Sequence, residues 1–282
     1  MANSCSLFTL REGAEMTTGT FSDIDAVIAY IHEHIYDPLP LSRLAEYASY
    51  SPYHFSRLFK EKMGLSPLYY VSSIRLQKAK HLLLHTRLSV RDIAMEIGQQ
   101  SLGTFTTRFT ERVGISPAQF RCSAVDASDH FSTLHKLKSW TPEYLLSSSA
   151  GKIEGIVQAA EPFHGVILIG LFPKPIPEGV PLYGTLLSSL GYFSFANVKP
   201  GTYYLMATSV SWGMGTNEIL LPQATLRTRS RDPIVVRPGL TVPKQQVMLY
   251  PPSLDDPPIL ISLSLLMQRF LSRISAKMDI SH

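Results

Sequence analysis

The chain has 282 residues, of which 45% are hydrophobic and 17% are charged, and its net charge is +4. The length predicts two domains, and the hydrophobic content excludes a wholly disordered protein. No apolar run reaches the roughly 18–20 residues of a membrane span, and the first residues do not resemble a signal peptide. We therefore expect a cytoplasmic protein without membrane contact, in which Cys5 and Cys122 are free thiols. A net charge this small does not by itself indicate a nucleic-acid binder.

Composition divides the chain into segments. Residues 21–121 carry 12 lysines and arginines against 9 acidic residues and hold few glycines, whereas glycine and proline recur after residue 151. A serine-rich stretch lies between these two parts. We predict a flexible tail at 1–20, a helical domain at 21–121, a linker at 122–150 with one short helix at 132–140, a β domain at 151–251 and a C-terminal helix within 252–282.

Strong helix signals fill the first half. Ser22 and Asp25 form a capping box ahead of isoleucines at helical spacing. Ser51-Pro52 is an N-cap followed by proline at the first helical position, and Gly64 is a helix stop. Ser66-Pro67 repeats the start signal and predicts a long helix to about residue 84.

This half contains an internal repeat. The apolar residues of the short helix at 41–48 recur 49 positions later at 90–97. The positions of the following helix, from Ser51 through Phe55 and Phe59 to Gly64, recur 50 positions later from Ser101 to Gly114. A short helix, a tight turn and a longer amphipathic helix make up a helix-turn-helix, so the chain is predicted to contain two of them.

The side chains that face away from the apolar stripe of each second helix are the candidates for contact with double-stranded DNA. In the first copy Arg57 can form a bidentate pair with a guanine edge and Lys60 can contact a phosphate. Two linked copies can enter successive major-groove faces roughly 34 Å apart. The alternative is an ordinary helical bundle with a solvated basic face. The predicted contact residues are Tyr53, His54, Ser56, Arg57, Lys60, Leu102, Gly103, Thr104, Thr106, Thr107 and Arg108.

Residues 21–121 resemble the AraC/XylS family of transcriptional regulators. The most specific match begins at Ser66-Pro67, continues through Arg75-Leu76 and ends with Ala79, Leu82 and Leu83; the segments at 89–94 and 114–121 match the second copy and its close. The resemblance implies sequence-specific DNA binding through both copies, usually in an activator, and places Tyr53, Ser56, Arg57 and Lys60 at contact positions.

Three features depart from the family pattern. Gln99 follows Gly98 where an aromatic residue is usual, and Thr107 stands where an arginine is usual, with arginine displaced to position 108. Gly103 and Thr104 also replace residues that offer more contacts. We therefore expect the first helix-turn-helix to carry more of the sequence specificity. In addition, the DNA-binding part comes first in this chain, whereas the family more often places it at the C-terminus.

The second half predicts a small all-β sandwich. Short strands are expected at 152–158, 166–172, 191–196, 202–210, 234–236 and 245–250, separated by turns such as those at 198–201 and 237–239. The stretch 191–207 resembles carboxypeptidase-regulatory-like, prealbumin-type sandwiches, which are non-catalytic. This resemblance implies a role in binding or assembly.

A final helix is expected to start at Asp256-Pro257, with Leu263, Met267 and Phe270 on its apolar face. Packing on the sandwich and dimer formation are the two interpretations of that face. Trp212, Tyr203 and Tyr204 are either core aromatics or the lining of an effector pocket.

No catalytic constellation is recognisable, so we predict neither enzymatic activity nor a cofactor. His32 with His34, and His81 with His85, lack the cysteine or carboxylate partners of a metal site. The sequence thus predicts a transcriptional regulator whose sandwich binds a small-molecule effector or forms a homodimer. The alternative is an assembly or ligand-binding protein, in which the sandwich grips a carbohydrate or protein partner and the helical part is a DNA tether.

Overall fold

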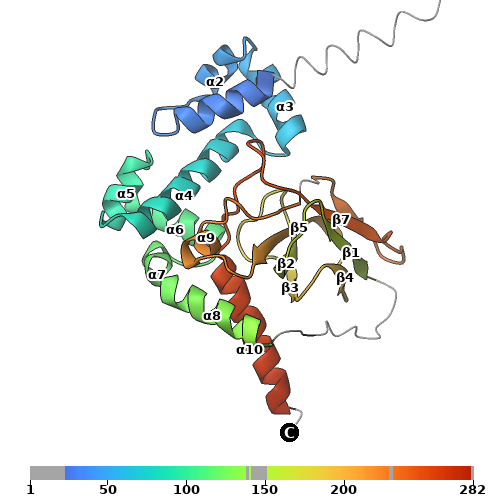
Figure 1. The fold of residues 1–282 in the computed structure, drawn as a ribbon. Helices are drawn as coiled ribbons and strands as arrows, with labels where there is room; N and C mark the ends of the chain where they lie inside the picture. Colours follow the sequence, from blue (N-terminus) through green and yellow to red (C-terminus); the bar gives the residue numbers. More distant parts are fainter. Residues whose placement is uncertain (1–22, 138–139, 141–150, 229–230, 281–282) are drawn as a thin grey trace, which may run out of the picture. The chain divides into compact units, whose positions relative to one another are not determined.

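The computed structural model describes residues 23–137, 140, 151–228 and 231–280 (Figure 1). It divides into two compact bodies, Met1–Ile74 and Arg75–His282, which we call the N-terminal and C-terminal bodies. The division falls within the long helix α4 (Pro67–His85). The predicted tail at 1–20, with Cys5, and the cap at Ser22 lie outside the described residues.

The N-terminal body is a small helical bundle. A helix at residues 23–33 precedes α2 (Leu41–Tyr47) and α3 (Pro52–Met63). Its core joins the isoleucines of the first helix to Phe55, Phe59 and Tyr70, all with 0% exposure. The Ser51 hydroxyl accepts the His54 N–H at the start of α3, as the Ser-Pro signal predicts.

Four further helices belong to the C-terminal body: α5 (Val90–Glu96), α6 (Leu102–Val113), α7 (Pro117–Cys122) and α8 (Ala124–Leu137). Ser89 and Asp92 form a capping box at the start of α5. The short helix expected at 132–140 is wrong in its bounds, because α8 starts eight residues earlier. Ala127 and Leu134 lie two turns apart on α8 and are both fully buried, so packing extends the helix through the serine-rich stretch.

The β part of this body consists of two sheets whose inner faces share one core. One sheet has the strand order β4-β1-β7 and the other β3-β2-β5-β6. All neighbours are antiparallel except β1 and β7. Single bridges from Arg227 to Thr208 and to Tyr250 link the two sheets at one side. The strands are β1 (Ile153–Ala159), β2 (Gly165–Phe172), β3 (Tyr183–Leu187), β4 (Gly191–Phe195), β5 (Gly201–Ser211), β6 (Ile234–Val236) and β7 (Gln245–Leu249).

Strand β2 is buried along its whole length, unlike a strand with one solvated face. Ile167, Ile169 and Leu171 face the shared core. The opposite face, with Leu168 and Phe172, is covered by the C-terminal segment around Ile259–Ile261. The continuous apolar run of β2 therefore reflects burial between two layers.

Two elements of this part were missed by the sequence reading. Strand β3 pairs with β2 although it lacks a clear alternation, and α9 (Thr216–Leu220) follows β5. The Gly213–Gly215 loop joins β5 to this short helix. The Glu218 carboxylate accepts the Gly215 N–H at 2.7 Å and thereby fixes the start of α9.

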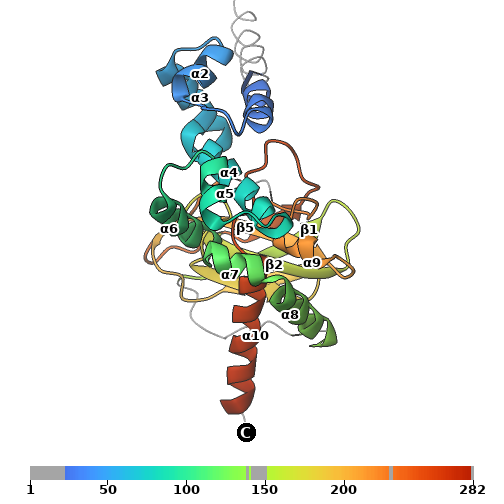
Figure 2. The same cartoon turned by 90° about the vertical axis from the view of Figure 1, so that its left-hand side faces the viewer.

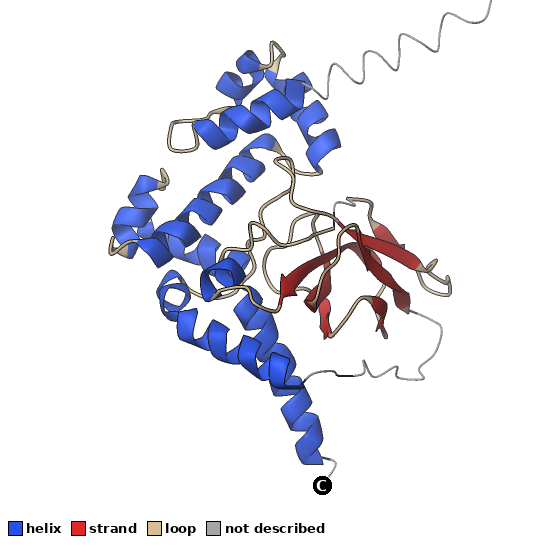
Figure 3. Ribbon diagram, in the orientation of Figure 1, coloured by secondary structure: helices blue, strands red, loops and turns tan. Residues whose placement is uncertain are grey.

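The final helix, α10 (Leu263–Ile280), starts later than predicted. The Asp256 carboxylate accepts the Ser253 N–H at 2.7 Å instead of capping a helix, and the Ser262 hydroxyl accepts the Leu265 N–H. Leu263, Met267 and Phe270 are buried within the chain, and α10 contacts α8, α9 and β3. Figures 1 and 2 show α8 and α10 side by side, and Figure 3 shows the strands gathered into one β part. The predicted fold class, helical helix-turn-helix part, β sandwich and C-terminal helix, is confirmed.

Candidate nucleic-acid interface

Helix α3 carries five predicted contact residues, and its inner face is anchored in the core of the N-terminal body. Phe55 and Phe59 anchor its inner face, and Gly64 ends it in a left-handed conformation with φ 70°. Tyr53 is 83% exposed, and Arg57 and Lys60 are exposed as well. No hydrogen bond or ion pair with a described residue engages Arg57 or Lys60.

The other two predicted residues of α3 are less available. His54 is half-buried, with its ring edge against Tyr50 at 5.1 Å between centroids. Ser56 is also half-buried. Tyr53, Arg57 and Lys60 therefore form the outward-facing set on α3, and their chemistry is that of an aromatic ring and two cations.

Helix α6 is built in the same way but offers weaker chemistry. Phe105 and Phe109 are fully buried, and the Ser101 hydroxyl accepts the Thr104 N–H. Thr106 is half-buried, whereas the other predicted residues are exposed. Arg108 lies 3.5 Å from the Gln99 side-chain oxygen, so its guanidinium has a partner within the protein. The exposed predicted residues of α6 are Leu102, Gly103, Thr104, Thr107 and Arg108.

The C-terminal end of α6 is bonded to the loop before β3 and to the segment before α10, both in the same body. The Gly179 N–H donates to the Arg112 carbonyl at 2.7 Å, and the Ser262 N–H donates to the Val113 carbonyl at 2.9 Å. These bonds satisfy carbonyls that a helix end leaves free. The Arg112 guanidinium pairs with Glu178 at 2.5 Å, with about a tenth of either side chain exposed.

Gly114, which ends α6 with φ 91°, is packed too closely for a side chain. A Cβ at this position would lie 2.6 Å from Leu265 and 3.1 Å from Ile261. The glycine therefore serves two purposes, since it permits the left-handed turn and admits the start of α10.

Lys80 on α4 is a buried cation that the sequence reading missed. Its side chain has 0% exposure, and the ammonium donates to the carbonyls of Ile259 and Leu260 at 3.1 and 3.2 Å. The Phe120 ring lies 5.3 Å from the nitrogen. Burial lowers the pKa of Lys80 to about 7. Its position on the stripe of Leu76, Ala79 and Leu83 was the available signal.

The remaining sequence candidates do not come together in one site. His32 bonds the Tyr70 hydroxyl and His34 bonds Asp37. The His81 and His85 rings lie 4.3 Å apart, and desolvation followed by the His85 charge lowers the pKa of His81. Among the described residues no group of three histidine, cysteine or acidic side chains can hold a metal ion. Cys122 is exposed.

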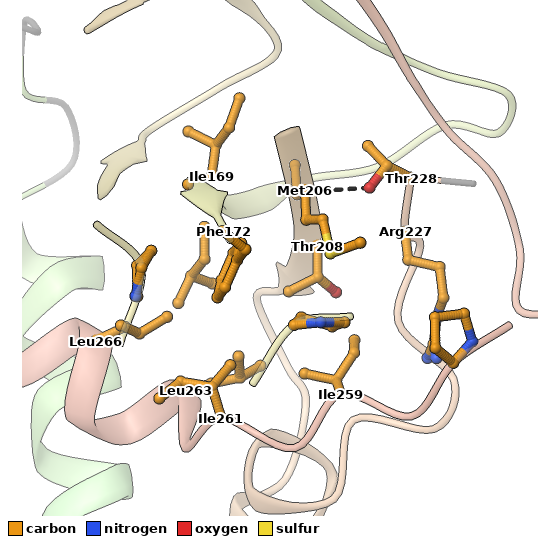
Figure 4. A pocket seen from close by; sticks show the side chains of 16 residues that line it. Ile169, Phe172, Met206, Thr208, Arg227, Thr228, Ile259, Ile261, Leu263 and Leu266 are labelled. Atoms are coloured by element: carbon orange, nitrogen blue, oxygen red, sulfur yellow. Dashed lines mark hydrogen bonds between the residues drawn. The ribbon is translucent and has the colours of Figure 1, made fainter. Parts of the chain in front are cut away.

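Two of the three aromatic candidates for an effector pocket, Tyr203 and Trp212, are packing residues. Tyr203 belongs to the core between the sheets, and Trp212 lies on Phe131 and His135 of α8 at 4.9 and 4.7 Å. Figure 4 shows instead a small apolar cavity between β2, β5 and the segment at 257–266. Its volume of about 40 Å³ is far below the roughly 300–1,000 Å³ of a small-molecule site.

Comparison with known proteins identifies the helical part. A family model described as a helix-turn-helix domain matches residues 44–123. The HTH-type transcriptional regulator YobQ of Bacillus subtilis is 36% identical over 96 residues, which are 34% of this chain and 40% of YobQ. The activator RhaS of Escherichia coli O1:K1 is 32% identical over 117 residues, which are 41% of this chain and 42% of RhaS. The solved AraC-type regulator from Chromobacterium violaceum is 26% identical, with a TM-score of 0.36, over 38% of this chain and 95% of that one.

The N-terminal region of the chain, which includes the matched residues 44–123, is an AraC-family helix-turn-helix DNA-binding domain. The chain spans about two fifths of the length of the two curated relatives, and both matches cover well under half of this chain. The AraC-family region includes α3 and α6, with the two sets of outward-facing residues described above. No described helix is long and apolar enough to span a membrane.

Proposed function

We propose that this protein is a sequence-specific transcriptional regulator in which α3 supplies most of the base recognition and the sandwich is a sensor. The observation that carries the proposal is a pair of cations on α3, Arg57 and Lys60, that pair with none of the described residues. They project from a helix fixed by Phe55, Phe59 and Gly64, so they can meet a duplex without breaking a hydrogen bond or ion pair in the described part of the chain. We assign residues 21–121 to DNA binding and 151–251 to sensing.

Helix α6 is the second part of the proposed interface. Its exposed threonines can contact phosphates or thymine methyl groups, and Arg108 must leave Gln99 before it can reach a base. We therefore propose that Leu102, Gly103, Thr104, Thr106, Thr107 and Arg108 position the protein on the DNA. On α3, Tyr53 and Arg57 make the specific contacts, Lys60 contacts a phosphate, and the half-buried His54 and Ser56 border the interface.

A gel-shift titration tests this division of labour. Genomic fragments that co-purify with the full chain supply the DNA, and Arg57→Ala is compared with Arg108→Ala and with the control Arg87→Ala. Arg87 is exposed and lies on neither α3 nor α6. Arg57→Ala is expected to weaken binding by about 1–3 kcal/mol, because a bidentate base contact is lost. An equal or larger loss for Arg108→Ala would contradict the proposal.

Salt dependence tests phosphate contact, and the preference for the co-purified fragments separates this function from the assembly alternative. If phosphates are contacted, affinity must fall steeply as salt rises, and Lys60→Ala must reduce the slope of log K against log salt by about 1. A protein that only tethers a carbohydrate- or protein-binding sandwich to DNA would retain no preference for the co-purified fragments over random duplex of equal length.

A further inference from the structure

A large groove opens on the C-terminal body between α10 and the strands β2, β3 and β4. Its volume of about 730 Å³ lies in the range of sites that enclose a small molecule. One wall is the exposed side of α10, with Gln268, Arg269, Ser272 and Arg273, and the other is formed by β3 and the loop before it. This groove is separate from the small apolar cavity of Figure 4, although Ile169, Pro181 and Leu266 border both.

The charge in this groove is positive and unbalanced. Arg269 and Arg273 stand one turn apart on α10, and none of the described lining residues is acidic. Arg273 donates to the Gly184 carbonyl at 3.1 Å, which holds its guanidinium against β3. Arg269 makes no hydrogen bond or ion pair with a described residue. Burial, and then the charge of Arg269, lower the pKa of Arg273, as expected for two cations that share a partly desolvated space.

The neutral lining combines hydrogen-bonding groups with an apolar wall. Thr185, Ser194 and Asn197 line the strand side, opposite Gln268 and Ser272 of α10. The apolar part comes from leucine, proline and phenylalanine side chains. Such a surface suits a ligand that has a hydroxylated body and one strongly acidic group.

We propose that the groove binds a small organic oxyanion, a phosphate ester or a carboxylate, through Arg269 and Arg273. Guanidinium groups bind both kinds of oxyanion in a bidentate manner, and two of them neutralise the charge of a phosphate ester. The hydroxyl and amide groups of the lining orient the body of the ligand. This proposal deepens the proposed function, because it rests on the sandwich being the sensor and names its ligand class and site.

The walls of the groove also touch the end of α6. Leu265 and Val180 line the groove and are among the side chains nearest to the Cβ position of Gly114. The two residues before Val180, Glu178 and Gly179, bind Arg112 through its side chain and its carbonyl. A ligand that draws α10 and β3 together therefore acts on side chains that fix the C-terminal end of α6.

Isothermal titration of the full chain without DNA tests the site directly. The probes are glucose 6-phosphate, gluconate and glucose, which share a six-carbon hydroxylated body and differ in their acidic group. Glucose 6-phosphate or gluconate is expected to bind and to identify the preferred oxyanion, while glucose gives no saturable heat. Arg269→Ala, which removes no hydrogen bond or ion pair with a described residue, is expected to weaken binding roughly 10-fold or more.

Matched variants make the outcome decisive. The control Arg237→Ala removes an exposed arginine of the sandwich that does not line the groove, and it is expected to leave affinity unchanged. Arg269→Lys keeps the charge but loses the bidentate geometry, so its affinity is expected to fall between wild type and Arg269→Ala. Equal binding by wild type and Arg269→Ala, equal binding of glucose, or no binding of either anionic probe would overturn the proposal. If the wild type binds an anionic probe but shows no DNA binding in the gel shift, the proposed regulator is rejected while the ligand site in the groove is retained.

Discussion

Replacing Lys80 by methionine should change the pH dependence of the stability of the C-terminal body. The native pKa of about 7 lies well below the usual value of 10.5 because burial disfavours the charged form. Between these two pH values the unfolded chain holds one proton more than the folded chain, so the stability of the wild type rises with pH. Below pH 7 both states are protonated, and the full cost of burying the charge is present.

The expected size follows from the linkage of one proton. The slope is at most about 1.4 kcal/mol per pH unit, so the wild type should gain about 2 kcal/mol relative to Lys80→Met between pH 7.5 and 9.5. The variant also removes the donor of two buried carbonyls, those of Ile259 and Leu260, at about 1–3 kcal/mol each. That loss does not vary with pH and shifts the whole curve.

Urea unfolding followed by tryptophan fluorescence measures this effect selectively. The only two tryptophans of the sequence, Trp140 and Trp212, belong to the C-terminal body. Trp140 donates to the Leu186 carbonyl and Trp212 lies on Phe131, so both report its tertiary structure. Lys78→Met, two residues away and half exposed, is the control. A stability difference between wild type and Lys80→Met that stays constant from pH 7.5 to 9.5 would refute the burial of this ammonium.

Three further substitutions test the contacts of α6, two at its C-terminal end and one on its outward face. Gly114→Ala should destabilise the C-terminal body by more than about 1–2 kcal/mol in the same urea titration, because φ is 91° and Leu265 occupies the space of the Cβ atom. The control Gly103→Ala, in the open first turn of α6, should be neutral or stabilising. Glu178→Ala should cost about 3 kcal/mol or more, because it removes the carboxylate that pairs with Arg112 where about a tenth of either side chain is exposed. Lys174→Ala, at a half-exposed ion pair, should change the free energy of unfolding by less than about 1 kcal/mol. Thr107→Arg restores an arginine at an exposed position of α6 and should raise DNA affinity about tenfold at low salt; an unchanged gel-shift midpoint would argue against DNA contact by this face.

The helical part could be predicted in detail because its signals are local. Serine caps, Ser-Pro starts and glycine stops act within one turn of the residues that carry them, and the repeat made each copy a check on the other. The bounds of α3 and α6 follow directly from Ser51 with Gly64 and from Ser101 with Gly114. Their outward faces were therefore available from spacing alone.

The β part was predicted less completely because its burial depends on remote segments. The residues at 257–262 were expected to open a helix, but the N–H groups of Leu260 and Ile261 donate to the Pro177 carbonyl instead. Strand β3 carries no clear alternation and exists because β2 offers it a partner. The apolar stripe around Lys80 indicates its burial, but nothing nearby in the sequence indicates that the carbonyls of Ile259 and Leu260 will accept its hydrogen bonds.

The two copies of the repeat share a frame but differ in what their second helices can do. Helix α3 carries two cations that pair with no residue in the described ranges, whereas α6 carries threonines and an arginine bonded to Gln99. The C-terminal end of α6 instead contacts the loop before β3 and the start of α10, through Arg112, Val113 and Gly114. On the proposed function, base recognition and response to a ligand therefore fall on different copies. A ligand in the groove would act through the position of α6 and leave the contacts of Arg57 chemically unchanged, so it would alter affinity more than sequence preference.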